Sequence, residues 1–301
     1  MRALARVLSG ASFALLLHCS AAETTVDEPA PKPVLTPEES QKPATCNDNW
    51  VSVAVGRVTT SDGQPIVGAT VGYCVKTETN LCLPVTASEK GGWYTYRIDA
   101  SHRCLKEIVS RADPKDEDLG KYSVSYCPIP LSATNGLLEL QTSQVLYPVE
   151  RPLSPISGGG RRSVSFPSGI ELTFAPDDFV DQQNSPKIGA AILDVTKPPC
   201  FVKPSHALAM LVAFGPDMSV NVLWDKPKVG FRIPNKAKLP EGSKVELLIL
   251  GGFATKLDKE HNAEEGSFEP YGTGTVRNGF IEPDPGSELP ALTMLGIRAK
   301  K

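Results

Sequence analysis

Apolar and polar residues alternate with a period of two along much of the chain, which is the pattern of β-strands that bury one face. In the first half this alternation, interrupted by turn residues, predicts strands at residues 51–58, 65–73, 81–87, 93–98, 122–127 and 137–145. Segment 104–112 stays open between strand and helix, because its apolar residues have helical spacing over only about two turns.

The second half shows the same alternation after a short boundary, residues 151–160, which contains two prolines and three consecutive glycines. The alternation predicts further strands at residues 164–166, 169–176, 188–195, 207–214, 229–233, 244–250 and 279–281. Segment 207–214 is continuously apolar, which indicates a strand buried on both faces. We therefore expect an all-β protein of two tandem β-sandwich domains, 46–150 and 151–301, with few side-chain contacts between them.

The first half also carries a motif beyond simple alternation. Val-Gly-Arg-Val at 55–58 is followed by Asp-Gly-Gln-Pro-Ile-Val-Gly-Ala-Thr-Val at 62–71, then by Thr86 and by Gly-Trp-Tyr at 92–94. These residues resemble the carboxypeptidase regulatory-like domain over 51–98, and more loosely up to Tyr147. The resemblance implies a prealbumin-like β-sandwich of about seven strands. The cysteines and the charged loop of this half are not part of that family's pattern.

The N-terminus has the order of charge and hydrophobicity that secretory signals have. Arg2 and Arg6 precede an apolar stretch of eleven residues, 7–17, which is too short to cross a bilayer stably. Leu-Leu-His-Cys at 16–19 resembles a bacterial lipobox, in which Cys19 becomes the lipidated first residue of the mature chain, although His18 departs from the pattern. Cleavage after Ser-Ala-Ala at 20–22 is the alternative and would release a soluble protein.

The segment after the signal is rich in proline and acidic residues. Residues 20–45 contain five prolines, five acidic residues and two lysines, with almost nothing large and apolar. This composition predicts a disordered tether, as commonly separates a lipid anchor from a folded domain. We expect residues 1–19 to be a signal peptide and the mature protein to be a lipoprotein of the outer membrane, or else a periplasmic or extracellular protein.

The cysteines are consistent with export. Six remain after Cys19, an even number, and six cysteines allow fifteen connectivities. Cys74 and Cys82 flank a polar hairpin tip and can face each other across adjacent strands. Cys104 and Cys127 bracket the charged loop 113–118, which leaves Cys46 to pair with Cys200. The alternative is that some of the six are buried free thiols.

Overall composition excludes several classes of protein. The 31 basic and 34 acidic residues balance, so we expect no nucleic-acid partner. The 41% of apolar residues excludes a fully disordered chain. The 25 glycines and 27 prolines are more than an average chain has, which favours short strands joined by turns over a helical bundle.

Motifs for metal or nucleophilic catalysis are incomplete. His261 and Glu264 match the H-x-x-E of zinc peptidases, but no later histidine can complete the three protein ligands. Ser168 lacks the first glycine of a G-x-S-x-G elbow. The glycines at 158–160 lack the ending of a phosphate loop. We therefore expect no catalytic residue, no metal site and no cofactor.

Two other groups of residues are candidates for recognition. Acidic residues at 113–118 and 177–181 could bind calcium, although neither has EF-hand spacing and solvated turns are the simpler explanation. Aromatic rings could line a binding surface, although core packing is the commoner role. These aromatic residues are Trp93, Tyr94, Tyr96, Trp224 and Tyr271.

The sequence favours a non-catalytic exported protein that is anchored to a membrane and acts in binding, adhesion or scaffolding, with an unknown protein or carbohydrate ligand. A carbohydrate or cell-wall binding module is one alternative, which aromatic rings exposed on one sheet face would support. A hydrolase with an unrecognised site is another, which a cleft of convergent ionisable groups with shifted pKa values would support.

Overall fold

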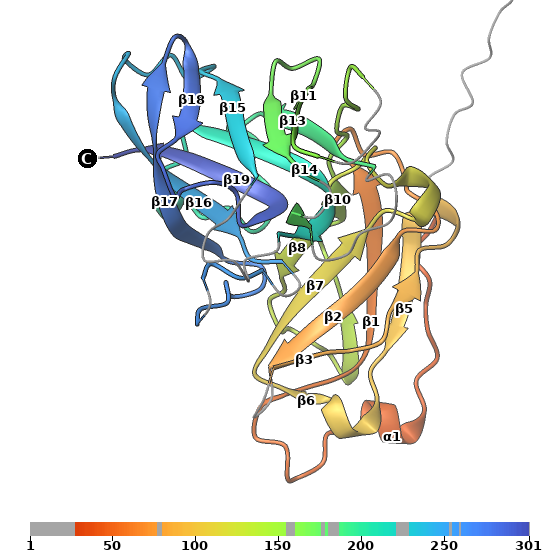
Figure 1. Cartoon of the computed structure of the whole chain (residues 1–301). Coiled ribbons are helices and arrows are strands. Elements are labelled where there is room, and N and C mark those ends of the chain that lie inside the picture. The colour runs from red at the N-terminus through yellow and green to blue at the C-terminus, as the bar shows by residue number, and fades with distance from the viewer. Residues whose placement is uncertain are drawn as a thin grey trace, which may run out of the picture.

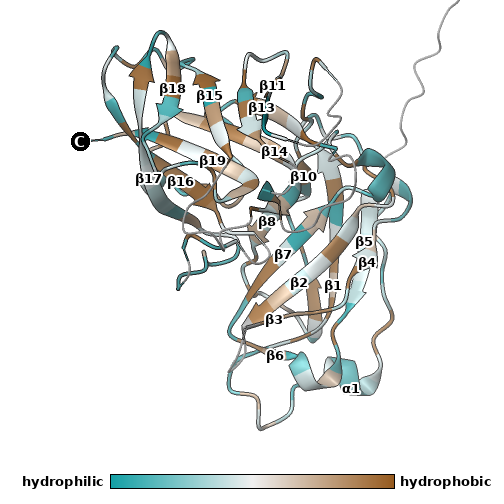
Figure 2. Cartoon of the chain, in the orientation of Figure 1, coloured by the Kyte–Doolittle hydropathy of each residue, from teal (hydrophilic) through white to brown (hydrophobic). Residues whose placement is uncertain are grey.

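The computed structural model describes residues 28–76, 80–154, 160–175, 178–179, 187–220, 229–252, 255–258 and 260–300 (Figure 1). Strands and β-bridges make up 48% of the described residues and helical turns 7%, which confirms the all-β prediction. Hydrophobic positions follow the strands, whereas loops are mainly hydrophilic (Figure 2). Within the described residues, no helix has the length and hydrophobicity of a membrane span.

The first half is built from two sheets that face each other across one apolar core. In one sheet, β1 (Asn49–Thr60) is central and pairs with β5 (Trp93–Arg97), β6 (Cys104–Leu105), β9 (Gly136–Glu139) and β10 (Gln144–Leu146). The other sheet consists of β2 (Thr70–Lys76), β3 (Asn80–Cys82), β4 (Thr86–Ala87), β7 (Glu107–Asp113) and β8 (Ser125–Pro128). The ambiguous segment 104–112 is therefore extended, because β7 alternates buried and exposed residues between β2 and β8.

The second half forms a single antiparallel sheet in the order β11-β12-β15-β18-β17-β16-β19-β14-β13. Its strands are β11 (Arg162–Ser165), β12 (Glu171–Phe174), β13 (Gly189–Leu193), β14 (Met210–Ser219), β15 (Gly230–Pro234), β16 (Lys244–Leu250), β17 (Phe268–Arg277), β18 (Phe280–Pro283) and β19 (Ala291–Ala299). Val164 lies on β11 and Ala190 on β13, the two end strands of the sheet, and both belong to the same buried cluster. The sheet therefore curls around its own core.

The helical elements are short. They are α1 (Pro37–Ser40) and the 3-10 turns η1 (Lys90–Gly92), η2 (Ala100–His102), η3 (Asp116–Asp118) and η5 (Pro204–His206). Most of them connect strands, whereas α1 packs against β1 and β9.

The two halves pack closely, so the expectation of few contacts between them is wrong. On β14, Val212 faces the curled sheet's core, whereas Leu211 and Ala213 belong to a second cluster together with Val124 and Tyr126 of the first half. The continuously apolar segment 207–214 already indicated burial on both faces. Its second face is covered by the first half of the same chain.

All six remaining cysteines form disulfides, but only one predicted pairing is confirmed. Cys74–Cys82 is present, whereas the expected Cys104–Cys127 and Cys46–Cys200 bonds are wrong. The observed bonds are Cys46–Cys104 and Cys127–Cys200. Pairing of β6 with the start of β1 places Cys104 beside Trp50 and near Cys46. Cys127 ends up at the contact between the halves, where Cys200 meets it.

Part of the predicted tether is ordered. Residues 1–27, including Cys19, lie outside the described residues, but residues 28–40 lie against the first half, and we call them the N-terminal strap. Trp93 Nε1 donates a hydrogen bond to the Glu28 carbonyl oxygen at 2.7 Å, and Lys90 pairs with the Glu28 carboxylate at 2.8 Å. The composition argument failed for this segment because polar contacts rather than apolar burial hold it.

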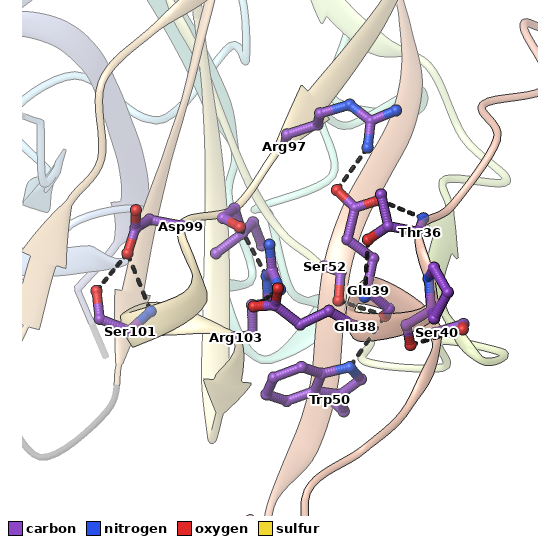
Figure 3. A network of polar contacts seen from close by, with 12 residues as sticks. Thr36, Glu38, Glu39, Ser40, Trp50, Ser52, Arg97, Asp99, Ser101 and Arg103 are labelled. Carbon is purple, nitrogen blue, oxygen red and sulfur yellow. Dashed lines mark hydrogen bonds and ion pairs between the residues drawn. The ribbon is translucent and has the colours of Figure 1, made fainter.

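Glu39 is the main attachment of the strap (Figure 3). Its carboxylate bonds to the Thr36 amide at 2.8 Å while the Thr36 hydroxyl accepts from the Glu39 amide, which is a capping box around α1. The second carboxylate oxygen pairs with Arg97 of β5 at 2.5 Å. Trp50 Nε1 and the Ser52 hydroxyl both donate to the Glu39 carbonyl oxygen. The hydrogen bond from Arg97 lowers the pKa of Glu39 below its usual value.

We expect Glu39→Gln to destabilise the protein by about 1 kcal/mol at pH 7, because Gln keeps the capping box but loses the charge that faces half-exposed Arg97. A carboxyl whose pKa is lowered by folding stabilises the fold above its unfolded pKa of 4.5 and loses this contribution as the pH falls through the lower folded pKa, so the difference should be smaller at pH 3.5. Urea unfolding at pH 7 and pH 3.5 measures both effects.

The matched control is Glu38→Gln. Glu38 is 76% exposed and lies 3.4 Å from Arg103, so its loss should cost less than about 0.5 kcal/mol. Equal effects of the two substitutions would show that the strap is not held by Glu39.

Candidate functional site

A groove opens on the first half, between the edges of its two sheets. It has a volume of about 690 Å³ and lies between segment 81–86 on one side and Thr95–Arg97 of β5 on the other, with Asp99 and His102 at one end. Both β5 and β3 are edge strands of their sheets. The groove therefore lies between the edge of β5 and the segment that runs from β3 to β4.

The walls of the groove differ in chemistry. Leu81 is 39% exposed and Val85 is 64% exposed, so the wall formed by segment 81–86 presents apolar surface. The Tyr96 hydroxyl donates a 2.5 Å hydrogen bond to the Pro84 carbonyl oxygen and ties this wall to β5. On the opposite wall, Asp99 accepts hydrogen bonds from Ser101, which lower its pKa and keep it ionised. The groove thus joins an apolar wall to a polar, hydrogen-bonding one.

A second group of polar side chains lies where the halves meet, and we call it the interface cluster. It consists of Arg111 and Asp113 of β7, Tyr126 of β8, Asp217 of β14, and Glu265 of the loop between β16 and β17. Arg111 Nε lies 2.6 Å from Asp113, and Arg111 Nη2 lies 3.8 Å from Asp217. The Tyr126 hydroxyl donates to Asp217 at 2.5 Å. Three carboxyl groups therefore share one guanidinium group at the junction.

Glu265 also touches the Cys74–Cys82 disulfide. Its Oε2 lies 3.1 Å from Cys82 Sγ, and its Oε1 is buried with no hydrogen-bond partner among the described residues. A disulfide sulfur carries no hydrogen, so this contact is a hydrogen bond only when the carboxyl group is protonated and donates. The geometry therefore favours a neutral Glu265.

The electrostatics of the cluster agree with this geometry. Burial raises the pKa of Glu265 to about 7, with Asp217 and Asp113 adding to the increase and Arg111 opposing it. Burial also raises the pKa of Asp113, against the effect of Arg111. Among the described residues the Arg111 guanidinium faces three carboxyl groups, and a proton on Glu265 reduces the repulsion between them.

The same contact does not form a metal site in the oxidised protein. One sulfur or oxygen atom from each of Cys74, Cys82 and Glu265 lies within 4.8 Å of the others. However, the two sulfur atoms are bonded to each other, and metals bind thiolates rather than disulfides.

The three described histidines lie in separate places and do not form a common site. His261 pairs with Asp258 at 2.8 Å in an exposed loop, which raises the pKa of the His261 imidazole. Glu264, its partner in the H-x-x-E match, is exposed as well. His206 packs against Phe268, and burial lowers the pKa of its imidazole. His102 lies beside the groove.

The two acidic segments have separate roles. Asp113 belongs to the interface cluster, whereas Asp118 pairs with Lys121 at 2.5 Å on the surface. In the other segment, buried Asp178 pairs with Arg161 at 3.1 Å, and residues 177 and 181 lie outside the described residues. Neither segment brings a third carboxylate to these pairs.

The aromatic candidates pack inside the protein. Tyr94 and Tyr96 are buried beside Tyr73, with ring centroids 6.5 Å and 4.7 Å from the Tyr73 ring. Trp93 faces the other way and is half-buried under Arg57. Tyr271 is half-buried, with its hydroxyl group inside the protein, and Trp224 lies outside the described residues. No aromatic ring is exposed on the described surface.

We expect Glu265→Gln to change how stability depends on pH. A carboxyl whose pKa is raised by folding leaves stability intact below its unfolded pKa of 4.5 and reduces it as the pH rises through about 7. Gln stays neutral, so the advantage of the variant should be small at pH 5, grow up to about pH 7 and reach about 2 kcal/mol at pH 8, a value reduced for residual solvent contact. Urea unfolding from pH 5 to pH 8 measures this.

Glu264→Gln is the control, because it removes the same charge from the neighbouring exposed residue. It should leave the pH dependence unchanged. Parallel curves for the parent and Glu265→Gln would mean that Glu265 is ionised in the folded protein throughout this range.

A scan of protein-family models gave no match, and a search of curated proteins found no relative. The resemblance of residues 51–98 to the carboxypeptidase regulatory-like domain therefore stays a prediction.

Proposed function

We propose that this chain is an exported, non-catalytic binding protein that holds an extended segment of another polypeptide in the groove. The groove itself is the observation that supports this role. Edge strand β5 on one side offers backbone groups to an added chain, and exposed Leu81 and Val85 on the other side offer contacts for apolar side chains.

Three disulfides within one chain indicate an oxidising environment, which is the environment of exported proteins. We extend this to a lipid anchor on Cys19 and a position at the outer membrane. Because the strap lies against the first half, the chain between such an anchor and the folded part is short. Glu28, the first described residue and one that contacts the first half, follows Cys19 by nine residues, and a chain of that length reaches at most about 30 Å. The groove-bearing half would then sit close to the lipid surface.

The alternatives have less support. A carbohydrate-binding face requires exposed rings, and the described part of the chain exposes none. The interface cluster does hold convergent ionisable groups with shifted pKa values, as a hydrolase would. These groups are packed between two halves, so we assign them to the interface.

The binding role predicts that a random phage-displayed library will yield peptides that bind to this protein in the groove. Val85→Glu places a charge on its apolar wall and should weaken binding of a selected peptide at least tenfold, measured by fluorescence anisotropy. Val67→Glu is the control, since Val67 is 53% exposed and does not line the groove. Failure to select any peptide, or equal effects of both substitutions, would contradict the proposed role.

The anchor predicts that cells expressing the chain incorporate labelled palmitate into it, and that Cys19→Ser abolishes the label. Cys19→Ser leaves the alternative cleavage site at 20–22 intact, so the protein should appear in soluble form. Label that survives the substitution, or its absence from the parent, would exclude the anchor.

A further inference from the structure

The Cys74–Cys82 disulfide lies where the groove meets the interface cluster. It joins directly opposed residues of β2 and β3, and Cys82 is exposed and lines the groove. From the other side, the loop between β16 and β17 brings the Glu265 carboxyl within 3.1 Å of Cys82 Sγ. The bond is thus open to a ligand on one side and touches an acid on the other.

The other two disulfides have different surroundings. Cys46 is 6% exposed and its partner Cys104 is half-buried, whereas Cys127 is 7% exposed and its partner Cys200 is exposed. Cys46 Sγ lies 3.5 Å from the Asp48 carbonyl oxygen, and Cys200 Sγ lies 3.7 Å from the Tyr126 carbonyl oxygen. A carbonyl oxygen cannot supply a proton. Among the described residues, the neighbouring acid is therefore what distinguishes the Cys74–Cys82 bond from the other two.

We propose that the Cys74–Cys82 disulfide reacts with a thiol that enters the groove, so that the protein captures a thiol-bearing ligand as a mixed disulfide on Cys82. The proposal rests on the same groove as the binding function but does not need a peptide ligand. It describes a stoichiometric capture without turnover.

The reaction balances without an added oxidant, since the disulfide itself is the oxidant. The ligand thiolate attacks the exposed Cys82 Sγ and forms a new S–S bond with it. The Cys74–Cys82 bond breaks, and its electron pair goes to Cys74 Sγ. Glu265, whose oxygen lies within 4.8 Å of that sulfur, gives its proton to the Cys74 thiolate and becomes a carboxylate.

Glu265 has the environment that a proton donor at this point needs. Burial raises its pKa to about 7, with the charges of Asp217 on β14 and Asp113 on β7 adding to the increase and Arg111 on β7 opposing it. An acid with a pKa near the working pH carries its proton in about half of the molecules and still releases it readily. The reverse reaction uses the resulting carboxylate as a base toward the Cys74 thiol.

The first test uses 2-mercaptoethanol and the full folded chain between pH 5.5 and pH 8.5. Samples are quenched with acid, and mass spectrometry locates the adduct. We expect an adduct on Cys82 while Cys46–Cys104 and Cys127–Cys200 stay intact. After correction for the fraction of thiolate, the rate should fall at least tenfold as the pH rises through 7.

Variants of the acid separate proton donation from a structural effect. Glu265→Gln should remove the pH dependence of the corrected rate, and Glu264→Gln should keep it. Glu265→Asp retains an acid and should retain a pH-dependent rate. An adduct that forms no faster than at Cys127–Cys200 would refute the proposal, as would a Glu265→Gln profile identical to that of the parent.

A second test distinguishes a polypeptide cysteine from a small thiol as the ligand. A groove-binding peptide is prepared with one cysteine and, as a control, with serine in its place. Faster capture of the cysteine peptide than of 2-mercaptoethanol identifies a polypeptide ligand, and equal rates identify a small thiol. If no peptide binds but 2-mercaptoethanol forms the adduct, the peptide-binding role fails and this proposal stands. If peptides bind and no thiol reacts, the peptide-binding role stands and the thiol-capture proposal fails.

Discussion

The two-sided hydrophobicity of the second sheet is the constraint on which the whole arrangement depends. Strands β14, β16 and β19 carry apolar residues on both faces, and curling the sheet buries only one of them. Leu211, Leu248 and Met294 on the other face would meet water if the second half stood alone. Covering them with Tyr126 and Val124 of the first half removes that apolar surface from solvent. The halves are therefore parts of one packed structure and not independent domains joined by a linker.

Close packing of the halves has an electrostatic consequence. The strands that cover the apolar face also bring Arg111, Asp113, Asp217 and Glu265 together from three separate elements. Burying several carboxylates around one guanidinium is unfavourable unless hydrogen bonds or protons compensate. Tyr126 compensates Asp217 by a hydrogen bond, and a proton compensates Glu265. The interface is thus sensitive to pH near neutrality, although its main driving force is apolar burial.

The sequence predicted what depends on neighbouring residues and missed what depends on distant ones. Alternation gave most strands, and Cys74–Cys82 followed from a hairpin only eight residues long. The pairings of Cys46 and Cys127 depend on which strands lie side by side, which local pattern does not encode. The strap was missed because a composition argument outweighed the Thr-Pro-Glu-Glu capping signal at 36–39. No spacing motif could have joined Glu265 to residues of the first half, since only the packed interface unites them.

The interface also decides what the disulfide can do. The first half alone would contain the groove and the bond between Cys74 and Cys82, because both arise from β2, β3 and β5. The acid comes from the second half, and Gly266 beside it packs so closely on Val109 that an added Cβ would lie 2.9 Å from that side chain. A bulkier residue there would push the loop away from β7 and take Glu265 with it. The reactivity that we assign to the disulfide therefore requires both halves packed together. The contact that buries the apolar face also positions Glu265, the proton donor.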